Sequence, residues 1–132
     1  MSVKKLPDYR LKQKTLYIDK TSPDTLIQYG DLYLEKGAPA DALDFYARGK
    51  SREGMEKIKA LALETGDAFL FQNAARALGN EPSQADWEAI AARATDLGKY
   101  LFARRALEKT NNAELINTIA ARIKAEEAQQ SA

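Results

Sequence analysis

The sequence predicts an all-α protein, a right-handed α-solenoid of about three helical hairpins followed by a C-terminal capping helix. Three observations support this fold class. Apolar residues recur at helical spacing in a series of short segments, and glycines separate most of these segments. Some of the glycines recur at intervals typical of helical hairpin repeats. A single hairpin cannot bury both of its faces, so neighbouring hairpins must cover it.

The composition is that of a globular chain with an uneven distribution of charge. Of its 132 residues, 45% are apolar and 30% are charged, and the formal net charge is +1. Residues 1–21 carry six Lys or Arg and two Asp, a net charge of +4, so the rest of the chain carries −3. We therefore expect a basic N-terminal arm (1–21), a helical-repeat domain (22–128) and a disordered tail (129–132).

Residue types that many enzymes need are missing from this sequence. The chain has no cysteine and no histidine, which excludes thiol and imidazole catalysis, disulfides and zinc fingers. Its glycines never cluster into a phosphate-binding loop, and its carboxylates fall on predicted helix surfaces. We expect no catalytic activity, no cofactor and no metal. No apolar run approaches the roughly 18 residues of a membrane span, and the basic N-terminus lacks the apolar core of a secretory signal, which favours the cytoplasm.

Capping residues and glycines set the limits of the predicted helices. Ser22, Ser51 and Ser83 are N-cap candidates, and Pro23 suits the first position of a helix. A glycine in the left-handed conformation, such as Gly37, ends a helix. The predicted helices span 23–36, 39–48, the segment between Ser51 and Gly66, 67–78, the segment between Ser83 and Gly98, 100–109, and a last segment capped by Asn111 or Asn112.

The repeat becomes visible when Gly37, Gly66 and Gly98, which are 29 and 32 residues apart, are aligned. The pattern of the first unit, Leu26-x-x-Tyr29-Gly30-x-x-Tyr33 followed by Ala42-x-x-x-Tyr46, resembles the tetratricopeptide repeat, and the unit around Trp87 is a fair match. The middle unit departs from the pattern because Lys59 replaces the small residue, and the terminal proline is absent from all three units. Coatomer-like or HEAT-like stacking is a related alternative.

The columns of this repeat have a packing explanation. A small residue on the first helix, such as Gly30, lets the second helix approach, and a large residue such as Tyr46 fills the space beside it. We expect Tyr33 and Trp87 to be packing anchors and not ligand contacts. The fourth helix, 67–78, which contains Phe69, is apolar around much of its circumference, so we expect it to be buried in the stack.

The resemblance implies that the first helices of the hairpins line a concave surface. The residues beside the packing columns there include eight carboxylates and no basic residue, so we expect an acidic groove that binds a basic or amphipathic peptide. The Lys, Arg and Asn clamp with which some tetratricopeptide domains hold a C-terminal carboxylate is absent. The candidate partner-binding residues are Asp24, Ile27, Asp31, Leu34, Glu35, Glu53, Glu56, Leu63, Glu88 and Asp96.

The alternative function is that of a helical-repeat protein associated with nucleic acid or the ribosome. The basic arm and the face around Arg104 and Arg105 would supply its phosphate contacts. The leading interpretation is a non-catalytic protein-interaction module, an adaptor or assembly factor. The arm also contains the apolar run 16–18, so we expect it to dock in the acidic groove of its own chain or of a second copy, a route to self-association.

Overall fold

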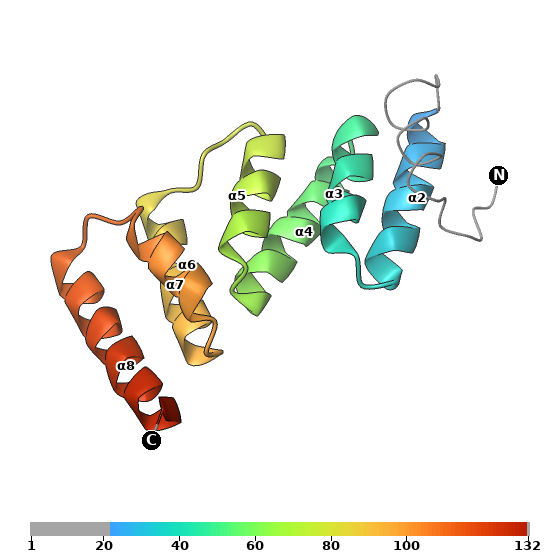
Figure 1. The fold of residues 1–132 in the computed structure, drawn as a ribbon. Coiled ribbons are helices and arrows are strands. Elements are labelled where there is room, and N and C mark those ends of the chain that lie inside the picture. Colours follow the sequence, from blue (N-terminus) through green and yellow to red (C-terminus); the bar gives the residue numbers. More distant parts are fainter. Residues whose placement is uncertain (1–21, 132) are drawn as a thin grey trace.

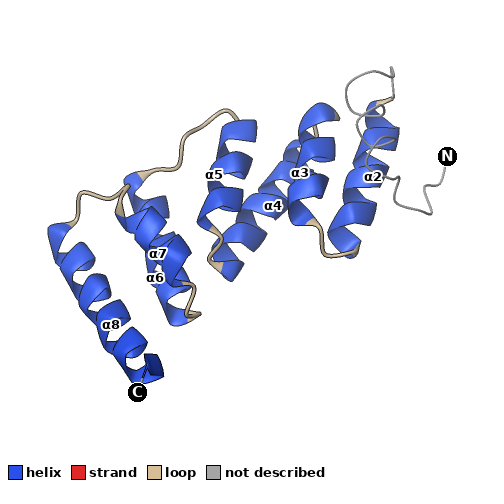
Figure 2. Cartoon of the chain, viewed as in Figure 1, coloured by secondary structure: helices blue, strands red, loops and turns tan. Residues whose placement is uncertain are grey.

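The computed structural model describes residues 22–131, and within this range the only regular secondary structure is α-helix, with no strand (Figures 1 and 2). The all-α fold class is thereby confirmed. The basic arm and its expected self-association lie outside the described residues. The helices are α2 (Pro23–Glu35), α3 (Pro39–Arg48), α4 (Arg52–Thr65), α5 (Ala68–Ala77), α6 (Gln84–Asp96), α7 (Tyr100–Leu107) and α8 (Ala113–Ser131).

Side-chain caps begin several helices at the positions that the sequence indicates. The hydroxyls of Ser22, Ser51 and Ser83 each accept a hydrogen bond from the backbone N–H three residues later, as does the carboxylate of Asp67. Ser83 also forms a reciprocal capping box with Asp86. These bonds satisfy backbone donors that would otherwise have no partner, so α2, α4, α5 and α6 each begin at a defined residue.

One hairpin turn requires glycine for two separate reasons. Gly66 ends α4 with a φ of 67°, a left-handed conformation that side chains disfavour. A Cβ at this position would also lie only 2.8 Å from the Cα of Ala94 on α6. The predicted helix end at Gly66 is confirmed, and the same residue permits close contact between α4 and α6.

The helices pack as successive pairs and form two layers. The most extensive contacts join α2 to α3, α4 to α5 and α6 to α7. Helices two places apart also touch, so that α2, α4, α6 and α8 follow one another in one layer and α3, α5 and α7 in the other. Figure 1 shows the helices as a row from α2 to α8. The buried apolar side chains form one cluster that extends from α2 to α8.

Tyr46 of α3 joins the first two hairpins. Its side chain is 1% exposed, and a Cβ added to Gly30 on α2 would lie 2.7 Å from its ring. A Cβ added to Gly54 on α4 would lie only 2.3 Å from the same ring. The expected pairing of Gly30 with Tyr46 is therefore confirmed, and Gly54 makes the ring a contact between hairpins as well as within one.

Three other positions of the repeat pattern can be compared with the structure. Tyr33 and Trp87 are buried, as expected for packing anchors. Lys59, which replaces the small residue of the middle unit, is half-buried, with its ammonium nitrogen 5.5 Å from the centre of the Phe71 ring. This cation–π contact lets a long cationic side chain occupy a packing position.

Two features differ from the sequence expectation. Phe69 on α5 is 43% exposed, although the apolar composition of this helix predicted burial, because no further helix within residues 22–131 covers its outer side. Helix α8 extends to Ser131, so residues 129–131, which we assigned to a disordered tail, continue the helix. Glutamine favours helix nearly as well as leucine does, which accounts for the extension. Within residues 22–131, no helix is long and apolar enough to cross a membrane.

Candidate interaction surfaces

The ten candidate residues from the sequence lie on three helices of one layer. α2 carries the first five, α4 carries Glu53, Glu56 and Leu63, and α6 carries Glu88 and Asp96. Ile27, Leu34 and Glu88 are half-buried and the other seven are exposed. Because α2 contacts α4 and α4 contacts α6, the structure brings these residues onto neighbouring helices. We call this surface the α2/α4/α6 face.

Asp31 has an internal partner. The hydroxyl of Tyr46 passes between α2 and α4 and donates a hydrogen bond of 2.5 Å to Asp31 Oδ1. Burial raises the pKa of Tyr46 far above its usual value, and the hydrogen bond to Asp31 raises it further. Asp31 therefore stabilises the packing of α3 on α2, a role that its exposed position on the helix did not reveal.

Several other carboxylates of the α2/α4/α6 face also have partners within the chain. Asp96 pairs with Arg122 of α8 at 2.6 Å, and Glu88 accepts a hydrogen bond from Gln84. Glu53 and Glu56 form longer ion pairs of 3.9 and 3.8 Å on α4. Within residues 22–131, no such ion pair is found for Asp24, Glu35 and Glu64. The α2/α4/α6 face is therefore less strongly acidic than the sequence suggested.

Basic side chains reach α4 from α6 and from the turn that follows it. The Nε of Arg93 donates to the backbone oxygen of Glu64 at 2.8 Å, and the Nζ of Lys99 donates to that of Thr65 at 2.5 Å. Both cations satisfy carbonyl groups at the C-terminus of α4, where positive charge is favourable. These contacts stabilise the packing of α6 against α4 and place positive charge at the edge of the α2/α4/α6 face.

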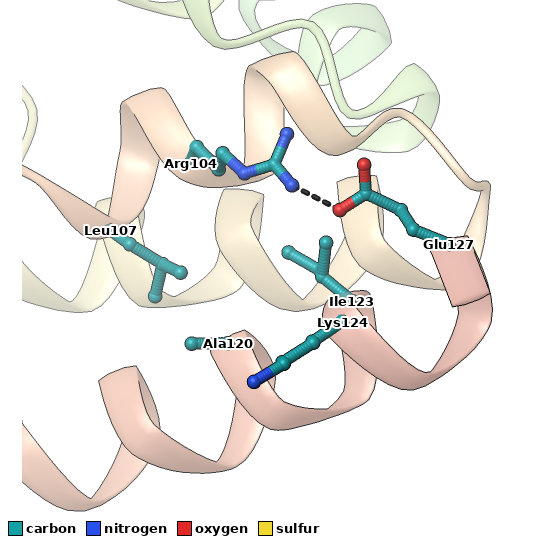
Figure 3. Close-up of a pocket in the computed structure, with 6 residues that line it drawn as sticks. All are labelled: Arg104, Leu107, Ala120, Ile123, Lys124 and Glu127. Atoms are coloured by element: carbon teal, nitrogen blue, oxygen red, sulfur yellow. Dashed lines mark hydrogen bonds and ion pairs between the residues drawn. The ribbon is translucent and has the colours of Figure 1, made fainter.

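The arginines of the alternative hypothesis also have internal partners. Arg104 pairs with Glu127 of α8 (Figure 3), and Arg105 lies 3.7 Å from Glu108. The guanidinium of Arg105 also lies 5.3 Å from the centre of the Phe69 ring. A phosphate would have to compete with these contacts, so the structure does not present the two arginines as a free cationic pair.

A surface cavity of about 320 Å³ lies between α7 and α8, beside the pair formed by Arg104 and Glu127 (Figure 3). Helix α8 is fixed in this position by Ile119 and Ile123, which are buried, and by a hydrogen bond from Tyr100 to Glu126. This bond lowers the pKa of Glu126 and raises that of Tyr100. The sequence analysis did not identify this cavity. It is lined by Arg104, Leu107, Ala120, Ile123, Lys124 and Glu127.

A longer groove lies in the other layer, between α3 and α5, with one end bounded by α7. It consists of two adjoining cavities of about 320 and 270 Å³ that share Ala40, Asp41, Leu70 and Asn73. We call it the α3/α5 groove. The sequence signal that could have revealed it is the apolar outer side of α5, which we assigned to the core. None of the ten candidate residues lines this groove or the cavity between α7 and α8.

No group of three or more acidic, cysteine or histidine residues within the described part of the chain is arranged to hold a metal ion. The surfaces on which the candidate residues or the cavities lie are the α2/α4/α6 face, the α3/α5 groove and the cavity between α7 and α8. Comparison of the chain with protein-family models, with curated proteins and with solved structures found no match.

Proposed function

We propose that the chain is a non-catalytic protein-interaction module, an adaptor or assembly factor built from tetratricopeptide-like hairpins. In this proposal the hairpins form a right-handed α-solenoid, and the α2/α4/α6 face is its concave surface. The alternating layers support it, as does the contact of Tyr46 with Gly30, because both are the packing that the repeat pattern implies. A cytoplasmic location is part of the same proposal.

The observation that carries the function is the combination of apolar and acidic side chains on the α2/α4/α6 face. Leu63 is 38% exposed, and Ile27 and Leu34 are half-buried on the neighbouring helix. The carboxylates of Asp24 and Glu35 lie on the same helix as Ile27 and Leu34. Such a surface suits a basic or amphipathic peptide, whose apolar side chains provide affinity and whose cations provide orientation.

Nucleic-acid or ribosome binding through Arg104 and Arg105 remains the alternative, and it is the weaker of the two. Each of these side chains already has a carboxylate partner, and Arg105 also packs against Phe69. A phosphate would therefore have to break existing ion pairs, because these arginines do not form an empty cationic site. The feature that supports this alternative is the net charge of +4 on residues 1–21.

The proposal is tested by binding of short fluorescent peptides to the full chain. One set combines Lys or Arg with Leu or Phe, and a control set replaces the cations by Glu. We expect the basic set alone to bind, and we expect Leu34→Lys with Leu63→Lys to abolish binding through the new charge. The matched control is Leu101→Lys on the other layer, where the side chain is 71% exposed. Equal binding of both sets, or tight salt-dependent binding of RNA alone, would contradict the proposal.

A further inference from the structure

Helix α8 begins in the same way as the first helices of the three hairpins. In each case a side chain accepts a hydrogen bond from the backbone N–H three residues later, and the capping residues are Ser22, Ser51, Ser83 and Asn112. Counted from this cap, Ala120 occupies the small-residue position of Gly30 and Ala91. The apolar positions around it hold Ile116, Ile119 and Ile123. Helix α8, which we expected as a capping helix, therefore also has the sequence pattern of the first helix of a fourth hairpin.

The described residues contain no second helix for this hairpin. In the three complete hairpins the second helix packs on the first, and α5 and α7 each also contact the second helix before them. A helix that continued this arrangement would contact both α7 and α8. The cavity between α7 and α8 lies along these two helices (Figure 3), and a second cavity of about 400 Å³ shares Arg104 and Leu107 with it. Together the two cavities form an open groove, which we call the α7/α8 groove.

Exposure at equivalent repeat positions distinguishes the last hairpin from the others. Gly30 is buried against Tyr46 of α3, whereas Ala120, at the same position of α8, is exposed and lines the groove. Gln72 of α5 is only 8% exposed although it is polar. Arg104 holds the equivalent position on α7 and is exposed. A second helix that packed in the α7/α8 groove would cover both exposed residues.

Helix α8 also lacks the glycine turn that leads from a first helix to a second. Gly37, Gly66 and Gly98 lie fifteen residues after their caps, and all three have a positive φ. Glu127 occupies this position in α8, and the helix continues through it to Ser131. The chain therefore does not reverse where the other hairpins do, so a helix from another molecule is the direct way to fill the groove.

We propose that α8 of a second copy binds in the α7/α8 groove, and that the two copies form a dimer with a two-fold axis near Ala120. The two helices of a hairpin run in opposite directions (Figure 1). A two-fold axis perpendicular to α8 gives the two copies of this helix the same antiparallel arrangement, and each α8 then occupies the groove of the other copy. The small side chain of Ala120 allows the close approach that Gly30 allows between α2 and α3. This surface is separate from the α2/α4/α6 face, so the proposal goes beyond the peptide-binding function.

Two charged side chains of α8 are complementary in this arrangement. Lys124 lines the groove beside Ala120 (Figure 3), and Glu114 is exposed in the first turn of the helix. Within residues 22–131, neither side chain forms an ion pair. They lie five residues on either side of residue 119, so the two-fold axis places Lys124 of each copy opposite Glu114 of the other. Exposed pairs of this kind fix the orientation, and burial of apolar lining residues such as Ile116 provides most of the affinity.

Analytical ultracentrifugation of the full chain over a range of concentrations measures the dimer. Ala120→Arg places a long cationic side chain at the contact, so we expect the dissociation constant of the dimer to rise about tenfold or more. The matched control Ala60→Arg makes the same change at an exposed position of α4 and should leave the dissociation constant unchanged. Circular dichroism establishes that each variant is folded.

Charge reversal tests the two-fold relation itself. Lys124→Glu and Glu114→Lys should each weaken the dimer severalfold, because each places like charges opposite one another. An equimolar mixture of these two variants should recover a dimer that contains one copy of each, since both contacts then join opposite charges. A chain that stays monomeric at every concentration, a dimer that Ala120→Arg leaves intact, or a mixture that dimerises no better than its components would overturn the proposal.

Discussion

The hydroxyl of Tyr46 donates a hydrogen bond of 2.5 Å to Asp31, and the two residues come from different helices of the first hairpin. The ring that carries this hydroxyl is packed between Gly30 and Gly54, so one side chain links α2, α3 and α4. A carboxylate that the sequence assigned to partner binding is thus also part of the internal packing. Asp31 therefore has a structural role on the α2/α4/α6 face, which distinguishes it from carboxylates there that have no contact of this kind.

Tyr46→Phe keeps the ring and removes the hydroxyl. We expect the free energy of unfolding to fall by about 1.5–3 kcal/mol, as for a hydrogen bond to a charged group. Urea denaturation measures this change, and Asp31→Ala in both backgrounds isolates the coupling between the two side chains. Additive effects of the two substitutions would show that the hydrogen bond contributes nothing to stability.

The same hydrogen bond predicts a loss of stability at alkaline pH. The pKa of Tyr46 in the folded protein is raised above the value of about 10 that is usual for tyrosine, so the contribution is complete below that pH. It is lost as the pH rises from there toward the folded pKa, because the unfolded state releases its proton first. Denaturation measured across this range should show a smaller decline for Tyr46→Phe. Identical pH profiles would rule out the linkage.

Gly54→Ala tests the close approach of α3 and α4. The added methyl group would lie 2.3 Å from Tyr46 Cδ1, so the ring must move. Overpacking of this kind costs about 1–3 kcal/mol. Thermal unfolding should show a lower melting temperature, and Tyr46→Leu in the same chain should reduce the penalty. A Gly54→Ala protein as stable as the original would mean that the helices are not held at this distance.

Trp87→Ala tests the packing anchor of α6. The side chain is 6% exposed, so its truncation should cost on the order of 3–5 kcal/mol and lower the melting temperature strongly. Leu101→Ala is the control, because substitutions at exposed sites usually change stability by about 0.5 kcal/mol or less. Unchanged melting of Trp87→Ala together with lost peptide binding would assign Trp87 to the binding site.

Local signals explain why the helix limits could be predicted. The serine caps at Ser22, Ser51 and Ser83 accept hydrogen bonds from backbone groups three residues away, and Gly66 ends α4 through its own left-handed backbone conformation. Each of these signals can therefore be recognised from neighbouring residues. The pairing of Gly30 with Tyr46 was also predictable, because both residues occupy positions in one repeated pattern.

Contacts between distant residues could not be predicted in the same way. The partner of Asp31 depends on Tyr46 passing between two helices, and the partner of Asp96 is Arg122 on a helix outside the aligned units. Phe69 presented a different difficulty. An apolar side chain is equally consistent with a core and with an exposed groove, and only the arrangement of the layers distinguishes them. The α3/α5 groove was missed for this reason.

The central claim is that the α2/α4/α6 face binds a basic or amphipathic peptide, and NMR mapping tests it most directly. The full chain, labelled with ¹⁵N, is titrated with the tightest-binding basic peptide, and changes in amide chemical shift are followed residue by residue. We predict that the largest changes fall around Ile27, Leu34 and Leu63. Changes confined to the lining of the α3/α5 groove, or no changes at saturating peptide, would contradict the claim.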